Sequence, residues 1–297
     1  MENSVQDLES LQALDHPRGE HRRRLRVGAW EMVLEGLESE LCDLVDKRWG
    51  GFVEGETIAS PALTLRIFEA GTELSPQLWS PGEVYKIEGE IVQGRLLVRA
   101  HHFVMCREDA GARIWRLGII RTPHEPPDRI VENAVRYLTA RLAVEKGGVA
   151  LHGAGVLRDG RAYVLAGPSR SGKTTAVRLS APSVSLGDDF AILLPGEGAW
   201  WTAAVPFDNS EEAPANPPRG SFPVAGVWRL HHAPRARVEA LRPARAVASL
   251  MGCAAFPWAM PDMADQVLEH VGRFIAESTF LHLYFREEPD FWKLLQG

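Results

Sequence analysis

Eight consecutive residues, from Gly167 to Thr174, read GPSRSGKT and match the phosphate-binding pattern G-x-x-x-x-G-K-S/T in full. Glycines let the backbone fold its N–H groups around phosphate oxygens, and the Lys173 ammonium reaches the β- and γ-phosphates. The Thr174 hydroxyl is a Mg²⁺ ligand. The apolar run AYVLA before the loop and the helix-compatible TTAVRLS after it supply the expected strand and helix. The sequence therefore predicts a site for ATP or another nucleoside triphosphate with Mg²⁺; a chance match in a Gly/Ser loop is the alternative.

The predicted nucleotide contacts come from the whole loop and from the residue that follows it. We expect the set to comprise Gly167, Pro168, Ser169, Arg170, Ser171, Gly172, Lys173, Thr174 and Thr175. Arg170 stands in a position that often holds a small residue. We expect its guanidinium to point to solvent, and an added phosphate contact is the alternative.

Two adjacent carboxylates, Asp188 and Asp189, begin only 15 residues after Lys173. The intervening chain has room for a helix over about 173–181, a turn through Pro182 and the strand SVSLG. If that strand lies next to the loop strand, both acids arrive beside the phosphates. One carboxylate can then hold Mg²⁺, directly or through water, and the other can accept a proton from an attacking hydroxyl. The alternative is a simple GDD turn before the next strand.

A histidine, His152, lies in the segment VALHGAG, 15 residues before Gly167. We expect this segment to be a strand that neighbours the loop strand. Beside a phosphate loop, an imidazole can hydrogen-bond the γ-phosphate or position the acids. A core or edge histidine without a chemical role is the alternative.

The order LHGAGVL, phosphate loop and GDDF resembles the HPr serine kinase family and its HPr-kinase-like relatives, which share a core with ATP-dependent phosphoenolpyruvate carboxykinases. The resemblance covers about residues 145–195. It implies a P-loop kinase domain with a mixed sheet and a catalytic set of His152, Lys173, Asp188 and Asp189. It also implies metal ligation by Thr174 and Asp188, proton acceptance by Asp189, and a possible homo-oligomer.

The sequence departs from true HPr kinases in two ways. It has no Glu-Ile-Arg-Gly-type segment for a further metal ligand, which Asp208, Glu211 or Glu212 could replace. The segment linked to the reverse reaction in those enzymes is also missing, so HPr is not the expected acceptor. We therefore predict an ATP- and Mg²⁺-dependent kinase that acts on a Ser or Thr hydroxyl, chiefly serine, of a peptide or protein. The alternatives are a small-molecule hydroxyl kinase and a nucleotide-binding regulatory or scaffold protein.

The elements that position these residues follow from hydrophobic periodicity and turn chemistry. The predicted fold is α/β, with a smaller β-rich N-terminal domain over 1–125 and the kinase domain over 126–297. The proline-rich segment RTPHEPPDR marks the boundary, and Asp128 is expected to cap the helix that follows it. Residues 1 to about 20 are expected to be poorly ordered. Within the first domain we expect strands over 25–36, 62–70, 83–108 and 112–120, a helix over 39–52, and a hairpin turn at Gln93-Gly94.

Composition restricts the partners and the compartment. With 33 Lys and Arg against 39 Asp and Glu, the formal net charge of −6 argues against general nucleic-acid or anionic-membrane binding. The basic cluster His16–Arg26 is expected to be a solvated segment leading into the first strand. The strand pattern around His101-His102 points the two rings to opposite faces, which disfavours a shared metal. Three dispersed cysteines (Cys42, Cys106, Cys253) and no run of 18 apolar residues indicate a cytoplasmic protein without a membrane span.

Overall fold

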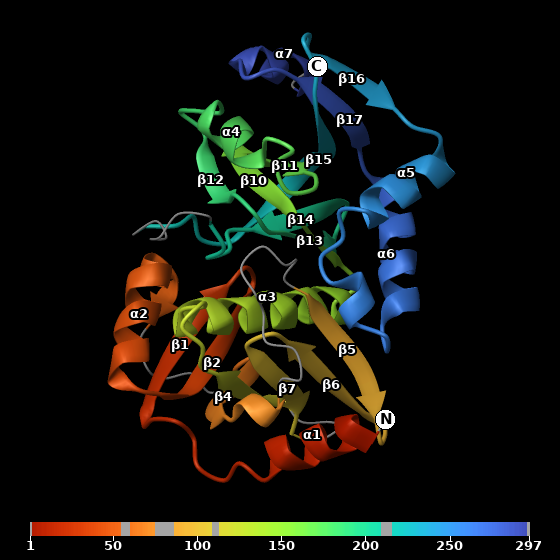
Figure 1. Ribbon diagram of the computed structural model, residues 1–297. Coiled ribbons are helices and arrows are strands. Elements are labelled where there is room, and N and C mark those ends of the chain that lie inside the picture. Colours follow the sequence, from red (N-terminus) through yellow and green to blue (C-terminus); the bar gives the residue numbers. More distant parts are fainter. Residues whose placement is uncertain (1, 55–59, 75–85, 109–112, 209–215, 296–297) are drawn as a thin grey trace. The chain divides into compact units, whose positions relative to one another are not determined.

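The structure is a computed structural model of the 297-residue chain, and it describes all residues except 1, 55–59, 75–85, 109–112, 209–215 and 296–297 (Figure 1). The fold is α/β, rich in strands, with mixed sheets. It divides into two compact units. The first contains the chain up to Leu138 together with Phe256–Ala264, and the second contains most of the remainder. We predicted a single boundary near residue 125. The structure instead assigns Phe256–Ala264, from late in the chain, to the first unit.

The first unit is built on a mixed sheet that has eight strands within the described residues, in the order β3-β1-β2-β4-β8-β7-β6-β5. Neighbours are antiparallel except for the β2–β4 and β4–β8 pairs, which are parallel. The bounds are β1 His21–Val27, β2 Trp30–Leu37, β3 Val53–Glu54, β4 Leu63–Ala70, β5 Ile87–Val92, β6 Arg95–Ala100, β7 Phe103–Arg107 and β8 Ile114–Ile120. The predicted hairpin at Gln93-Gly94 is confirmed, because both residues adopt positive φ between β5 and β6.

The helices of the first unit are α1 (Glu2–Gln12), α2 (Ser39–Trp49) and the start of α3 (Pro127–Glu145), with short 3₁₀ turns at η1 (Gly50–Phe52), η2 (Thr72–Leu74) and η3 (Pro257–Ala259). The expectation of a poorly ordered N-terminus was wrong. Leu8 and Leu11 of α1 are fully buried and pack with Val104 and Ile120 of the sheet. Their three-residue spacing places both side chains on one helix face. This apolar face predicts a packed helix, but we overlooked it because most residues of the segment are polar.

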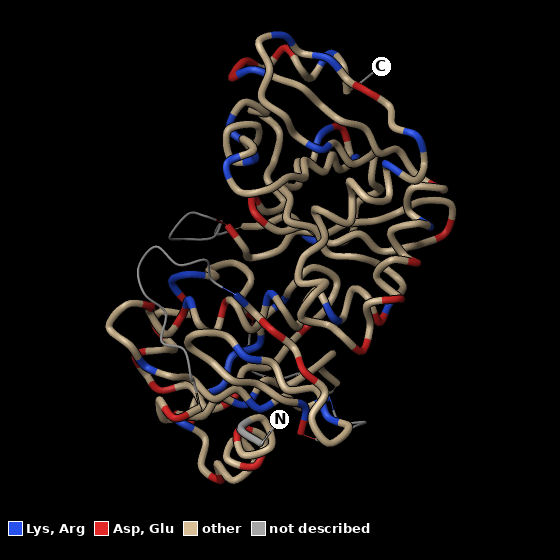
Figure 2. The backbone as a smooth tube through the Cα atoms, turned by 45° about the vertical axis from the view of Figure 1, so that its right-hand side comes forward, with Lys and Arg blue, Asp and Glu red and all other residues tan. Residues whose placement is uncertain are grey.

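The basic cluster is also different from its prediction. Its second half is itself strand β1, and its arginines are paired with carboxylates. The Arg23 guanidinium donates to both carboxylate oxygens of Asp46, and Arg24 and Arg26 both donate to Glu54. Figure 2, which colours the backbone by residue type, shows acidic and basic residues interspersed along the chain. The cluster is therefore part of the sheet framework.

Two local predictions in this unit need correction. His101 and His102 occupy the turn between β6 and β7, not the interior of a strand, and their ring centroids are 6.4 Å apart. Asp128 lies inside the first turn of α3, which begins at Pro127, and its carboxylate accepts a hydrogen bond from Arg48 of α2. Asp128 therefore anchors α2 to α3 instead of capping the helix.

The second unit is built on a mixed sheet with nine strands on or beside its path within the described residues. The main path is β12-β10-β11-β15-β14-β13-β9, and β17 pairs with both β15 and β16. The β11–β15 and β15–β17 pairs are parallel, whereas β10 and β12 run antiparallel to their neighbours. The bounds are β9 Val149–Leu151, β10 Gly153–Arg158, β11 Arg161–Ala166, β12 Val184–Gly187, β13 Ala191–Gly196, β14 Ala199–Ala203, β15 Ser221–His232, β16 Arg237–Ala240 and β17 Phe280–Phe285.

Aromatic packing fixes one face of this sheet. Tyr163 of β11 stacks on Trp228 of β15 and meets Trp292 edge-on, with centroid distances of 5.5 and 5.0 Å. The Trp292 indole N–H donates to the Ser180 hydroxyl just beyond α4, at 3.1 Å. The remaining helices are α4 Lys173–Arg178, α5 Pro243–Met251, α6 Ala264–Glu277, α7 Trp292–Leu295 and the 3₁₀ turn η4 Pro289–Phe291. The core thus holds α4 against the strands that carry the site.

The strand that ends just before the two aspartates is not a direct neighbour of the loop strand in the sheet. The strand SVSLG is β12, and it pairs with β10, so β10 lies between it and the loop strand β11. The condition considered from the sequence, that this strand lies directly beside the loop strand, is therefore not met, although the acids still reach the loop. Strands β10 and β11 are consecutive in the sequence and form a hairpin, so β10 occupies that edge of β11. No helix among the described residues is long and apolar enough to cross a membrane.

Candidate active site

The loop between β11 and α4 has a backbone that depends on glycine. Gly172, immediately before the lysine, has φ of 95°, and a Cβ there would lie 2.8 Å from the Phe285 ring. Any side chain at this position would strain the backbone and clash with a fully buried aromatic ring. Arg170 also has a left-handed φ, 64°, and its residue is exposed, as its sequence position predicted. These two conformations turn the chain around the space above α4.

The lysine is buried inside the loop. The Lys173 side chain is 6% exposed, and its Nζ donates to the carbonyls of Gly167 and Pro168 at 3.2 and 3.1 Å. The nearest carboxylate oxygen, Asp189 Oδ1, is 3.7 Å from Nζ. Burial lowers the pKa of Lys173, and the Asp189 carboxylate opposes part of this shift. The ammonium is therefore held mainly by groups that a phosphate oxygen can replace.

The threonine and the first aspartate form a pair suited to a divalent cation. Thr174 Oγ1 donates to Asp188 Oδ2 at 2.9 Å, and the Asp188 backbone N–H donates to Asp208 Oδ1 at 2.7 Å. In the described part of the chain no group of three or more His, Cys, Asp or Glu side chains could hold a metal. Mg²⁺ at phosphate sites takes one or two protein ligands beside phosphate and water oxygens, so this hydroxyl–carboxylate pair fits it.

The three residues named as replacement metal ligands have different outcomes. Asp208 does reach the acid pair, through the Asp188 backbone. Glu211 and Glu212 lie outside the described residues.

The second aspartate is shared by the histidine and the lysine. His152 Nε2 and Asp189 Oδ1 are 2.7 Å apart, and the same oxygen faces Lys173. His152 stands between β9 and β10. Its carbonyl accepts the Gly167 N–H at 3.1 Å, and its own N–H donates to the Cys253 carbonyl at 2.7 Å. Backbone pairing therefore fixes the imidazole beside the first residue of the loop.

A glycine also sets the direction of the two acids. Gly187 ends β12 with φ of 133°, and a Cβ there would lie 2.8 Å from Val205 Cγ2. This conformation turns the chain at the strand end. Asp188 then meets Thr174, and Asp189 meets His152. Two adjacent acids thus have separate partners.

These side chains open onto one pocket of about 530 Å³. Eight residues predicted from sequence line it: His152, Ser169, Arg170, Gly172, Lys173, Thr174, Thr175 and Asp189. Of the other predicted site residues, Gly167 and Ser171 are buried in the loop, Pro168 is exposed, and Asp188 is buried against Thr174. The sequence reasoning missed two wall residues, His232 and Glu287. No local sequence signal marks them, because the parallel pairing of β15 with β11 and with β17 sets them beside the loop.

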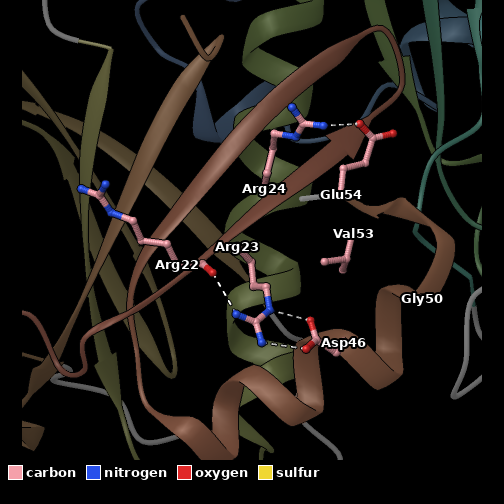
Figure 3. A pocket seen from close by; sticks show the side chains of 7 residues that line it. All are labelled: Arg22, Arg23, Arg24, Asp46, Gly50, Val53 and Glu54. Carbon is pink, nitrogen blue, oxygen red and sulfur yellow. Dashed lines mark hydrogen bonds and ion pairs between the residues drawn. The ribbon is translucent and has the colours of Figure 1, made fainter. Parts of the chain in front are cut away.

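A second pocket, of about 400 Å³, lies in the first unit and is lined by Arg22, Arg23, Arg24, Asp46, Gly50, Val53 and Glu54 (Figure 3). Its three guanidiniums are each within ion-pair distance of a carboxylate. Arg22 pairs with Glu35 at 2.6 Å, and the pairs of Arg23 and Arg24 are drawn in Figure 3. This pocket has cations but no motif of the phosphate-loop kind.

Residues 130–274 are similar to a family described as SynChlorMet cassette protein ScmC. The match covers just under half of the chain and includes the phosphate loop, His152 and the acid pair. No curated protein matches the chain.

Proposed function

We propose that this protein is an ATP- and Mg²⁺-dependent kinase that transfers the γ-phosphoryl group to a hydroxyl, chiefly a serine of a peptide or protein. We assign its second unit to the HPr-kinase-like type of P-loop kinase. The observation that carries the proposal is the separation of the two acids: Asp188 contacts the loop hydroxyl, while Asp189 contacts His152 and faces Lys173. A nucleotide-binding site alone does not require a second carboxylate held in this way.

Phosphate binding is the task of the loop and Lys173. The ammonium leaves the carbonyls of Gly167 and Pro168 and donates to phosphate oxygens, so one set of hydrogen bonds replaces another. Thr174 and Asp188 would hold Mg²⁺, which neutralises charge on the phosphates when bound. The low exposure of Lys173 strengthens its attraction to phosphate, because water screens a buried charge less.

Proton transfer is the task of Asp189. Its carboxylate accepts the proton of the attacking hydroxyl while the new oxygen–phosphorus bond forms and the bond to the leaving diphosphate breaks. His152 Nε2–H donates to Oδ1 of the ionised carboxylate and fixes its orientation. Lys173, facing the same oxygen, stays close to the transferred group. The acid that handles the proton is therefore distinct from the acid that handles the metal.

The compartment is part of the proposal. Cys42, Cys106 and Cys253 are free and buried. Burial raises the pKa of Cys106 to about 11, which keeps this thiol protonated and unreactive. Free thiols of this kind suit the cytoplasm, where we place the protein.

The proposal is tested with ATP radiolabelled in its γ-phosphate, Mg²⁺ and a pool of peptides with a central serine. The matched control is the same pool with alanine in place of serine. We expect phosphoserine only in the first pool, and no transfer when Mg²⁺ is chelated. Transfer to polyols and not to peptides would favour a small-molecule kinase. Tight ATP binding without any turnover would contradict the kinase proposal and favour a regulatory or scaffold protein.

A further inference from the structure

The strand order of the second unit separates the two ends of a bound nucleotide. From one side to the other the strands run β12, β10, β11, β15, β17, and β11 ends in the phosphate loop. His152 precedes β10, and the acid pair follows β12. The catalytic side chains therefore come from one side of β11, and β15 and β17 lie on its other side.

The proposed function, on which this inference rests, fixes the direction of the triphosphate. The γ-phosphate must lie toward Asp189 and His152, because the proton acceptor faces the transferred group. The nucleoside is at the opposite end of the phosphate chain. It is therefore directed across the loop, toward the strands on the other side of β11. The parallel strands β15 and β17 end at the same edge of the sheet as β11.

His232 closes the pocket on that side. It is the last residue of β15, and its Nε2 lies 3.1 Å from the Arg170 carbonyl of the loop. Its ring stacks on Phe285, at a centroid distance of 5.9 Å and an interplanar angle of 21°. Phe285 is also the ring that a Cβ at Gly172 would strike. The imidazole is thus held against the loop and remains exposed on the pocket wall.

Glu287 is the second wall residue, just beyond β17. Its carboxylate makes no ion pair or hydrogen bond with any described residue, although the neighbouring Arg286 pairs with Glu288 and Asp290. An unpaired carboxylate in the same pocket as a bound polyphosphate is repelled by it. Glu287 is exposed, so water solvates its carboxylate when the pocket is empty. When a polyphosphate is bound, hydrogen bonds from another part of the ligand would offset the repulsion. Ribose hydroxyls are such donors, and carboxylates bind them in dinucleotide sites.

We infer that the nucleoside of the bound nucleotide lies over the ends of β15 and β17, with its ribose hydroxyls donating to Glu287 and with His232 packed against it. The phosphate end and the nucleoside end are then recognised by different groups. Binding of a bare polyphosphate uses only the loop. Binding of the nucleotide adds the contacts of His232 and Glu287.

The test compares the Kd values of the magnesium complexes of ATP, 2′-deoxy-ATP, 3′-deoxy-ATP and inorganic tripolyphosphate by titration calorimetry. For the wild type we expect loss of a ribose hydroxyl to weaken binding about 10-fold, the effect of removing one hydrogen bond to a charged group. One of the two deoxy nucleotides should bind the wild type more weakly than ATP does. In Glu287→Ala, this nucleotide and ATP should have the same Kd. Tripolyphosphate should bind to this variant no more weakly than to the wild type, because loss of the carboxylate removes a repulsion. His232→Ala should weaken ATP several-fold and leave tripolyphosphate unchanged.

Glu288→Ala is the matched control, since it removes an adjacent carboxylate that pairs with Arg286 and does not line the pocket. It should retain the wild-type preference for the ribose. An unchanged preference for the ribose in Glu287→Ala, or an equal loss of affinity for tripolyphosphate, would overturn the inference and leave the kinase proposal intact. If the wild type binds neither ATP nor tripolyphosphate, the proposed function fails and the inference fails with it.

Discussion

The two pockets of this protein both contain cations, but they hold them differently. In the first unit the guanidiniums of Arg23 and Arg24 donate to carboxylates, Arg23 in a bidentate pair (Figure 3). In the second unit the Lys173 ammonium donates to two loop carbonyls, and the nearest carboxylate oxygen is 3.7 Å away. A bidentate charged pair is stronger than a bond to a neutral carbonyl. A basic pocket therefore indicates an anion site only where the acceptors that hold its cations can be exchanged for oxygens of the ligand.

The two pockets also differ in the backbone that shapes them. The phosphate loop turns at Gly172, where a side chain would strike Phe285. The arginine pocket lies along strand β1, whose residues are in regular antiparallel register with β2 apart from an irregularity at His21/Arg22. One pocket is shaped by a loop that turns on glycine, and the other by arginines of β1 that pair with carboxylates of neighbouring strands and of α2.

The largest effect on nucleotide binding is expected from Lys173→Ala. Removal of a charged donor to the phosphates should raise the Kd of Mg·ATP by about 100-fold, equivalent to about 3 kcal/mol. Arg23→Ala, the matched variant in the other pocket, should leave this Kd unchanged. Calorimetry on both variants measures the contrast. Equal losses would mean that the two pockets do not differ as described.

Thr174→Val should have a smaller effect that depends on the metal. Loss of the hydroxyl that contacts Asp188 should weaken Mg·ATP about 10-fold, because one ligand and its hydrogen bond are removed. Binding of ATP in the presence of a chelator should change little. The ratio of the Kd values with and without Mg²⁺ measures this dependence on the metal. An equal loss of affinity under both conditions would show that Thr174 is not a metal ligand.

A third effect is expected on raising the pH. Burial lowers the pKa of Lys173 below its usual 10.5, so the ammonium is lost at a lower pH than that of an exposed lysine. Phosphate binding needs the charged form, and the affinity for ATP should therefore fall before pH 10.5 is reached. Titrations between pH 7 and 10 measure this decline. An arginine at this position keeps its charge over that range, so in Lys173→Arg the affinity, although weaker, should stay constant.

The smallest effect is expected in the arginine pocket. A double-mutant cycle with Arg23→Ala and Asp46→Ala should give a coupling free energy of about 0.5–1 kcal/mol in unfolding, because the pair is partly exposed. Salt should weaken the coupling. Urea denaturation at low and high ionic strength measures it. A coupling above about 3 kcal/mol would show that this pair is a buried structural element.

The loop was predictable because its chemistry is local. Gly167 to Thr174 carry the pattern in consecutive residues, and the flanking strand and helix also follow from local sequence. The structure brings His152 and the acid pair to this loop, as the spacing predicted. The neighbour of β12 was not predictable in the same way, since short strands carry no mark of the strand with which they pair.

The far wall of the pocket was not predictable. His232 and Glu287 are set beside the loop by the parallel pairing of β11, β15 and β17, and these strands are far apart in the sequence. No local pattern records that pairing. Helix α1 was missed for another reason: its buried face consists of a few leucines within a polar segment, and burial by the sheet stabilises it more than helix propensity does.

The most direct test of the account is the single-turnover rate of phosphoryl transfer from bound Mg·ATP to the serine peptides in Asp189→Asn. Asp159→Asn, in an exposed turn between β10 and β11, is the matched control. The account predicts that Asp189→Asn binds ATP and loses about 100- to 10,000-fold in rate, the range of general-base catalysis, while the control transfers normally. Transfer at the wild-type rate by Asp189→Asn would contradict it.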